Sequence, residues 1–103
     1  MAFDGTEGGA ISLPQGAALT KEYRLRNPTA IKGHFFGKEI LNQILEQEGC
    51  MGIRMYYALD PETGERELVL AGANEEEDDM LDLVADLSSP CPTRCSSANT
   101  LNS

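Results

Sequence analysis

One turn in the middle of the chain limits the possible folds more than any other feature. Residues 60–64, Asp-Pro-Glu-Thr-Gly, have turn composition, because proline presets its own φ and Gly64 can adopt the left-handed conformation. A four-residue loop pairs Asp60 with Glu65. Counting back along both segments gives the other pairs: Leu59 with Arg66, Tyr57 with Leu68, Met55 with Leu70 and Ile53 with Gly72. The sequence therefore predicts an antiparallel β-hairpin.

The two faces of this hairpin differ in polarity. Alternate residues of a strand share a face, so one face is apolar and carries Ile53, Met55, Tyr57, Leu59, Leu68 and Leu70. The other face is mixed and carries Arg54, Tyr56, Ala58, Glu67, Val69 and Ala71. An isolated hairpin is marginal in water. We therefore expect the apolar face to be core and to lie under helices.

Two helices are predicted before the hairpin. Ser12 and Gln15 form a capping box, which predicts a helix over 13–26 that ends before Pro28. A second helix is predicted over 38–48, with Gly49 as a left-handed cap. Its apolar residues recur at helical spacing: Ile40, Leu41, Ile44 and Leu45. Residues 29–36 form either a short strand or a loop.

The acidic stretch after the hairpin allows two interpretations. Residues 75–79, Glu-Glu-Glu-Asp-Asp, could supply carboxylate ligands to a cation. They are also typical of a helix start, with Asn74 as the cap and acids at the positive end of the dipole. The favoured interpretation is a third helix, with an apolar stripe of Met80, Leu83, Val84 and Leu87. The fold class is then α+β: a hairpin of two or three strands covered by two or three helices.

Length, charge and composition predict the domain organisation and exclude some classes of partner. The 103 residues predict a single α+β domain over 12–95, a mobile Gly-rich segment over 1–11 and a polar tail over 96–103. Seventeen acids against eight Lys and Arg give a net charge of −9, which argues against binding nucleic acid or an anionic membrane. No apolar run approaches the roughly 20 residues of a membrane span, and no secretory signal is evident. We expect a cytoplasmic protein, with export by another route left open.

Three cysteines and the single histidine are the candidate ligands of a zinc site. Zinc takes four Cys or His ligands, and Cys91 and Cys95 could supply two of them from one turn, although with three residues between them rather than two. Cys50 and His34 flank the predicted helix 38–48 at opposite ends, roughly 15 Å apart at 1.5 Å per residue. They can therefore join one metal only if the chain around His34 doubles back.

Other chemistry at the cysteines is also open. Cys91 and Cys95 could form a small disulfide, or either could pair with Cys50, and Arg94 beside Cys95 would favour its thiolate. The simplest interpretation is structural, with Cys50 as a buried apolar residue and the turn at 91–95 as a static tie. Hydrolytic catalysis lacks support, because a nucleophile–base pair would have to use His34 and no matching nucleophile is evident.

Several segments together resemble a group of small bacterial proteins that have no assigned activity. The segments are 33–38 (Gly-His-Phe-Phe-Gly-Lys), 52–60 (Gly-Ile-Arg-Met-Tyr-Tyr-Ala-Leu-Asp), 91–95 (Cys-Pro-Thr-Arg-Cys) and 101–103 (Leu-Asn-Ser). The resemblance extends over about residues 12–103. It implies a bacterial source and no particular mechanism.

The sequence thus predicts a non-enzymatic module for protein interaction or structure. The mixed hairpin face around Arg54, Tyr56 and Val69 is the predicted contact surface for a protein partner or a second copy. The alternative is a zinc-binding or thiol-redox module that uses Cys50, Cys91 and Cys95. No cofactor other than zinc is indicated.

Overall fold

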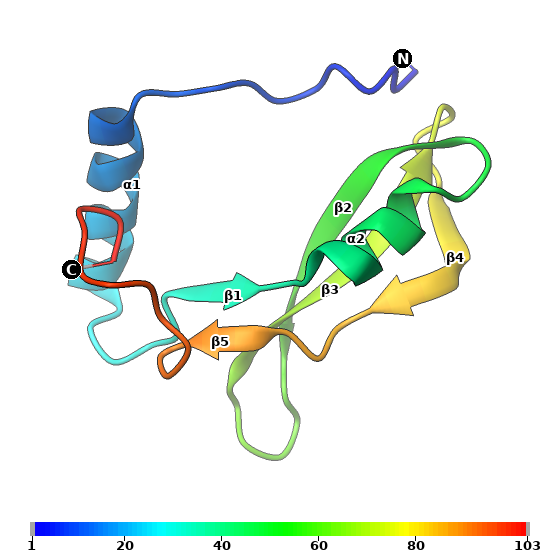
Figure 1. The fold of residues 1–103 in the computed structure, drawn as a ribbon. Coiled ribbons are helices and arrows are strands. Elements are labelled where there is room, and N and C mark those ends of the chain that lie inside the picture. Colours follow the sequence, from blue (N-terminus) through cyan, green and yellow to red (C-terminus); the bar gives the residue numbers. More distant parts are fainter. Residues whose placement is uncertain (1, 103) are drawn as a thin grey trace. The chain divides into compact units, whose positions relative to one another are not determined.

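The computed structural model describes residues 2–102 as an α+β chain with two helices and two antiparallel sheets (Figure 1). The terminal residues Met1 and Ser103 lie outside this description. The elements in order are α1 (Leu13–Arg26), β1 (Gly33–Phe35), α2 (Lys38–Leu45), β2 (Cys50–Leu59), β3 (Arg66–Asn74), β4 (Asp79–Ala85) and β5 (Ser89–Cys91). Neither helix among the described residues is long and apolar enough to cross a membrane.

The contacts divide the chain into two compact units, whereas the sequence predicts one domain over 12–95. Unit 1 comprises residues 2–8 and 36–88, and unit 2 comprises residues 9–35 and 89–102. Unit 1 holds α2 and the three-stranded sheet with order β2-β3-β4. Unit 2 holds α1 and the two-stranded sheet of β1 and β5.

The predicted hairpin register is confirmed. Asp60 donates its backbone N–H to the Glu65 carbonyl at 2.8 Å, and Gly64 has φ +74°. The Asp60 side chain also accepts from the backbone of Glu62 and Thr63, which stabilises the turn from inside. β2 and β3 then pair as counted: Leu59 with Arg66, Tyr57 with Leu68, Met55 with Leu70 and Ile53 with Gly72.

The core of unit 1 forms where α2 packs on one face of the sheet (Figure 1). Ile44 of α2 and Leu70 of β3 are fully buried, and Ala85 of β4 is 7% exposed. Partly buried side chains from the link before α2, from α2 and from β2, β3 and β4 surround them: Phe36, Ile40, Leu41, Cys50, Ile53, Leu68 and Leu83. The helix predicted over 38–48 is shorter than expected, because α2 ends at Leu45 and its C-cap is Glu46 in the right-handed region. Gly49, the predicted left-handed cap, has φ +86° but lies in the link to β2.

The expectation that the whole apolar hairpin face is core was wrong. Met55, Tyr57 and Leu59 are 56%, 96% and 66% exposed. The physical reason is length, because α2 ends at Leu45 and its eight residues extend about 12 Å, whereas ten residues of strand extend about 33 Å. The helix can cover only the half of the hairpin that contains Ile53 and Leu70.

The predicted third helix was also wrong, because residues 79–85 form strand β4. The β3–β4 register shifts between Ala71 and Gly72, so the strand is irregular and its apolar residues do not follow a strict period of two. The spacing of Met80, Leu83 and Val84 imitates a helical stripe for this reason. Asn74 caps a turn instead of a helix, since its side chain accepts from the backbone N–H groups of residues 76 and 78.

Unit 2 begins with the helix that the sequence predicted. Ser12 and Gln15 form both hydrogen bonds of the capping box, and α1 ends at Arg26. The short strand β1 pairs with β5, with His34 opposite Pro90, rather than with the hairpin. Beyond β5, Cys91 and Cys95 are joined as a disulfide.

Candidate functional site

The outer face of the unit 1 sheet, opposite α2, carries an ion pair that connects the two edge strands. Arg54 on β2 and Asp79 on β4 lie on either side of β3, and their side chains meet at 2.5 Å. Neighbouring strands are about 4.8 Å apart, so these side chains must reach over the central strand. Ala71 and Ala73 of β3 lie beneath them and are each 3% exposed. Small side chains on the central strand make this contact possible.

Hydrogen bonds tune the titration of this cluster. The Tyr56 hydroxyl and the Arg54 guanidinium both donate to Asp79 and hold the pKa of that carboxyl below its usual range. The same carboxylate raises the pKa of Tyr56 and that of Arg54. Each group is stabilised in the charge state that it already has at neutral pH. The cluster is therefore built for fixed contacts rather than for proton transfer, which needs a pKa near the working pH.

The structure brings together the predicted contact residues Arg54, Tyr56 and Val69. They lie on the outer face, with Tyr56 directly opposite Val69. Tyr56 is 45% exposed, whereas Arg54 also donates to the Glu77 carbonyl at 3.2 Å and is committed to contacts within the unit. Tyr56 is therefore the exposed part of this surface, whereas Arg54 and Val69 are partly buried.

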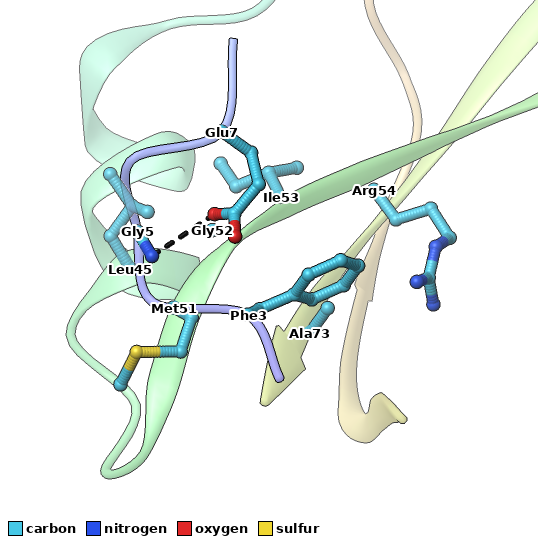
Figure 2. A pocket seen from close by; sticks show the side chains of 9 residues that line it. All are labelled: Phe3, Gly5, Glu7, Leu45, Met51, Gly52, Ile53, Arg54 and Ala73. Atoms are coloured by element: carbon cyan, nitrogen blue, oxygen red, sulfur yellow. Dashed lines mark hydrogen bonds between the residues drawn. The ribbon is translucent and has the colours of Figure 1, made fainter. Parts of the chain in front are cut away.

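A pocket of about 490 Å³ lies beside the first half of β2 (Figure 2). Its apolar walls come from the N-terminal segment, the end of α2 and the sheet: Phe3, Leu45, Met51, Ile53 and Ala73. The Phe3 ring centre is 5.5 Å from the Arg54 guanidinium carbon, a cation–π arrangement. The volume suits a small ligand or an inserted side chain.

The part of the pocket that sequence reasoning missed is its N-terminal wall. Phe3 donates its backbone N–H to the Glu75 carbonyl at 2.9 Å, and the Glu7 carboxylate accepts from the backbone of Asp4 and Gly5. The one signal for this contact is Phe3 itself, the single aromatic residue in a Gly-rich polar stretch. The other aromatic side chain of this face, Tyr56, follows from the strand pattern.

The outward edge of β2 has no pairing strand among the described residues. Asp60 is hydrogen-bonded to Glu65, and bonded and non-bonded pairs alternate along an antiparallel ladder. The backbone N–H and C=O groups of the odd-numbered residues therefore point to this edge: Ile53, Met55, Tyr57 and Leu59. Three of these residues also expose their apolar side chains. The edge offers hydrogen-bonding groups and apolar surface in the same place.

The four candidate metal ligands are divided between the units. Cys50 is a free thiol at the start of β2 that packs against the unit 1 core and donates to the Gly52 carbonyl at 3.2 Å. His34, Cys91 and Cys95 belong to unit 2 and line a common cavity. Zinc binds thiolates, and the disulfide removes two of them. Within residues 2–102 no group of three or more His, Cys, Asp or Glu side chains is arranged to hold a metal.

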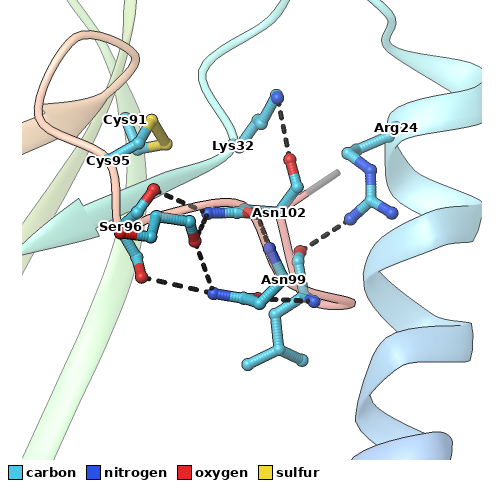
Figure 3. Close-up of a disulfide and its surroundings, with 9 residues drawn as sticks. Arg24, Lys32, Cys91, Cys95, Ser96, Asn99 and Asn102 are labelled. Carbon is cyan, nitrogen blue, oxygen red and sulfur yellow. Dashed lines mark hydrogen bonds between the residues drawn. A yellow bond between two sulfur atoms is a disulfide. The ribbon is translucent and has the colours of Figure 1, made fainter.

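The disulfide lies at the base of a C-terminal turn that hydrogen bonds hold together (Figure 3). The Asn102 amide donates to the carbonyls of Ser96 and Ser97, and the Asn102 side chain accepts from the Asn99 backbone at 2.8 Å. Two cations reach the same turn. Arg24 of α1 donates to the Leu101 carbonyl at 2.6 Å, and Lys32 donates to the Asn102 carbonyl at 2.9 Å.

Charge is divided unequally between the units. Unit 1 carries 16 Asp and Glu against three Lys and Arg, which gives a formal charge of −13. Unit 2 carries five Lys and Arg against one acid, Glu22, which gives +4. These values sum to the −9 of the whole chain. The two units therefore carry net charges of opposite sign.

Comparison with protein-family models, with curated proteins and with solved structures found no match. The resemblance to small bacterial proteins stays a prediction.

Proposed function

We propose that the chain is a protein-binding module and that the edge of β2 in unit 1 accepts an extended segment of a partner protein. The observation that carries this proposal is the open edge beside Met55, Tyr57 and Leu59. Proteins usually protect such edges with lysine, proline or inward-pointing charge. β2 contains neither lysine nor proline, and its one charged residue, Arg54, is turned onto the outer face by Asp79. A partner strand at this edge would extend the sheet.

The charge of unit 1 indicates the chemistry of the partner. Its −13 formal charge would repel an acidic segment and attract a basic one. Carboxylates also flank the open edge at the hairpin turn, where Asp60, Glu62 and Glu65 follow Leu59. The pocket beside Met51 and Ile53 offers a place for one apolar side chain of the incoming segment. We therefore favour a partner segment that alternates basic and apolar residues over a second copy of unit 1.

Nuclear magnetic resonance with synthetic peptides tests this proposal. The ¹⁵N-labelled chain would be titrated with a nine-residue peptide of alternating Lys and Val, and with a matched peptide of alternating Glu and Val. We expect the Lys-Val peptide to shift the amide signals of Ile53, Met55, Tyr57 and Leu59, and the Glu-Val peptide to leave them in place. Shifts confined to α1, or equal shifts with both peptides, would contradict the proposal.

A pair of variants at Met55 separates hydrogen bonding at the strand edge from nonspecific hydrophobic binding. Met55→Pro removes an N–H that points to the open edge and leaves the β2–β3 hydrogen bonds intact. Met55→Thr changes the side chain and keeps the N–H. Loss of one hydrogen bond of about 1 kcal/mol corresponds to a roughly fivefold weaker affinity. We expect that loss for the proline variant relative to the threonine variant.

A second candidate function is thiol–disulfide exchange at Cys91 and Cys95 in unit 2. The observation that favours it is that these two cysteines are already joined, with Cys95 exposed to solvent and Cys91 partly so. An accessible disulfide can be attacked by an external thiolate. Alkylation followed by mass spectrometry tests it: one adduct, on Cys50, is expected before reduction and three after mild reduction. Three adducts without reductant would contradict a disulfide.

A further inference from the structure

The cavity that contains the disulfide is also the cationic part of the molecule. Its volume is about 420 Å³, and β1, β5 and the C-terminal turn contribute to its walls. The residues that matter chemically are Lys32, His34, Cys91, Arg94 and Cys95. The backbone N–H of Arg94 donates to the Pro90 carbonyl at 2.9 Å, which fixes the turn that carries Arg94 and Cys95. Two basic side chains and the disulfide therefore line one space.

Among residues 2–102, no ion pair joins Lys32 or Arg94 to a side-chain carboxylate. Glu22 is the one acidic side chain of unit 2, and it forms an ion pair with Arg26 at 2.7 Å on the exposed side of α1. Lys32 donates to a backbone carbonyl of Asn102 (Figure 3), which satisfies one of its three N–H donors and leaves its charge in place. The cavity thus has a local positive charge within a chain of net charge −9.

We propose that this cavity recruits a small anionic thiol, one that also bears a carboxylate, as the reductant of the Cys91–Cys95 disulfide. This inference rests on the second proposed function and names its substrate class. The carboxylate of the incoming molecule is held by Lys32 and Arg94, and its thiol group is directed at Cys95, the more exposed of the two cysteines.

The reaction proceeds in two exchange steps. The external thiolate attacks Cys95 Sγ, the Cys91–Cys95 bond breaks, and Cys91 leaves as a thiolate while a mixed disulfide forms on Cys95. A second thiolate attacks the external sulfur of the mixed disulfide, which releases the symmetrical disulfide of the reagent and the Cys95 thiolate. Two external thiols are oxidised and the protein disulfide is reduced by two electrons. Arg94 and Lys32 lower the energy of both departing thiolates.

Rates of reduction by three simple thiols test the proposal. The full-length oxidised chain would be treated at 0.1 M salt with 3-mercaptopropionate, 2-mercaptoethanol or cysteamine, which are anionic, neutral and cationic apart from their thiol groups. Rates are followed by acid quench, alkylation and mass spectrometry, and are corrected for the thiolate fraction and nucleophilicity of each reagent. We expect the anionic thiol to react about tenfold or more faster than the cationic one, the scale of local electrostatic steering. The net charge of −9 predicts the opposite order, so the measured order distinguishes the local charge of the cavity from the net charge of the chain.

Variants connect the preference to the cavity. Arg94→Gln and Lys32→Gln should each bring the anionic-to-cationic rate ratio towards one, whereas Lys38→Gln in unit 1 should leave it unchanged. The ratio should also fall at 1 M salt, where the screening length is about 3 Å. A variant that merely loosens the turn would raise all three rates and preserve the ratio. Equal or reversed preference in the unaltered chain overturns the anionic-thiol proposal alone, whereas a disulfide that none of the three thiols reduces overturns the exchange function itself.

Discussion

The close packing of α2 on the sheet predicts that adding a side chain at Gly72 of β3 destabilises the fold. Gly72 is buried, and a Cβ built on it would lie 2.9 Å from Cys50 Sγ, 2.9 Å from Gln47 Nε2 and 3.3 Å from Ile44 Cγ2. A Cβ atom does not tolerate contacts under 3.0 Å. Gly72→Ala must therefore displace α2 or force two side chains from their places. Glycine is required here by the close approach of the helix and not by a special φ angle.

The size of the effect follows from what has to move. Gln47 can rotate away, but it then loses its 2.9 Å hydrogen bond to the Ile44 carbonyl, which is worth about 1 kcal/mol. Overpacking of a core costs about 1–3 kcal/mol. Alanine restricts the unfolded chain, which returns about 0.4–1 kcal/mol. We expect Gly72→Ala to lower the free energy of unfolding by about 1–3 kcal/mol.

A second glycine in the same sheet is the matched control. Gly52 of β2 has nothing within 4 Å of a built Cβ, and its φ is not positive. Gly52→Ala should therefore be neutral or stabilising by up to about 1 kcal/mol. Both variants would be unfolded in urea and followed by circular dichroism. If Gly72→Ala were as stable as Gly52→Ala, the packing of α2 over β3 described above would be refuted.

A double variant identifies the obstructing atom. Cys50→Ala removes the Sγ that lies 2.9 Å from the built Cβ of residue 72. Residues in contact usually show coupling energies of about 0.5–3 kcal/mol. We expect Gly72→Ala to cost at least about 0.5 kcal/mol less in the Cys50→Ala background than in the unaltered chain. Strict additivity would show that Cys50 is not the obstacle.

Three further predictions concern charge and backbone strain in unit 1. The hydrogen bond with Asp86 raises the pKa of the Glu67 carboxyl. The protonated carboxyl therefore stabilises the fold at low pH, and this contribution is lost as pH rises from the unfolded pKa of about 4.3 through the native value. Glu67→Gln should raise Tm at pH 7 and have little effect near pH 3. The hydrogen bonds from Tyr56 and Arg54 lower the pKa of Asp79. The contribution of the ionised carboxylate to stability is present above about pH 4 and is lost as pH falls through the native value. Asp79→Asn should lower Tm at pH 7 and flatten the acid limb of the Tm–pH curve. Leu87 is 97% exposed at φ +60°, so Leu87→Gly should raise the free energy of unfolding by about 0.5 kcal/mol in urea.

Each of these predictions has a control of the same chemistry. Glu62→Gln in the hairpin turn and Asp82→Asn on β4 change the same charge without the same hydrogen bonds. Gly64→Ala, at φ +74°, should lose about 1 kcal/mol where Leu87→Gly gains stability. A Tm change at pH 7 that is the same for Glu67→Gln and Glu62→Gln would show that net charge, and not the Asp86 contact, is responsible.

The elements that could be predicted from the sequence are those with local chemical signals. The capping box at Ser12 and Gln15 predicts the start of α1 correctly, and the turn at 60–64 predicts every β2–β3 pair that was counted from it. Both signals act over four or five residues and do not depend on distant contacts. β4 has no such signal, because its irregular pairing with β3 places apolar residues at spacings that a helix also has.

The residues of the Arg54, Tyr56 and Asp79 cluster could also be predicted only in part. Arg54 and Tyr56 were predicted to face one way because of strand alternation, and they do. Their partner Asp79 could not be found, since it lies two strands away and was assigned to a helix. The disulfide was one of several alternatives, because the spacing of Cys91 and Cys95 allows a bond without requiring one. The contact of Phe3 with Arg54 depends on a segment with no regular structure, which periodicity cannot detect.

Because the two units carry opposite charge, the β2 edge and the disulfide cavity should prefer ligands of opposite charge. A net charge of −9 acting alone would attract cationic ligands everywhere on the chain and repel anionic ones. The β2 edge is expected to favour a basic segment, and the cavity at Cys91 and Cys95 is expected to favour an anion. These opposite preferences cannot both come from net charge. If both are observed, and if Arg94→Gln abolishes only the second, then each ligand is selected by the charges of the unit that binds it.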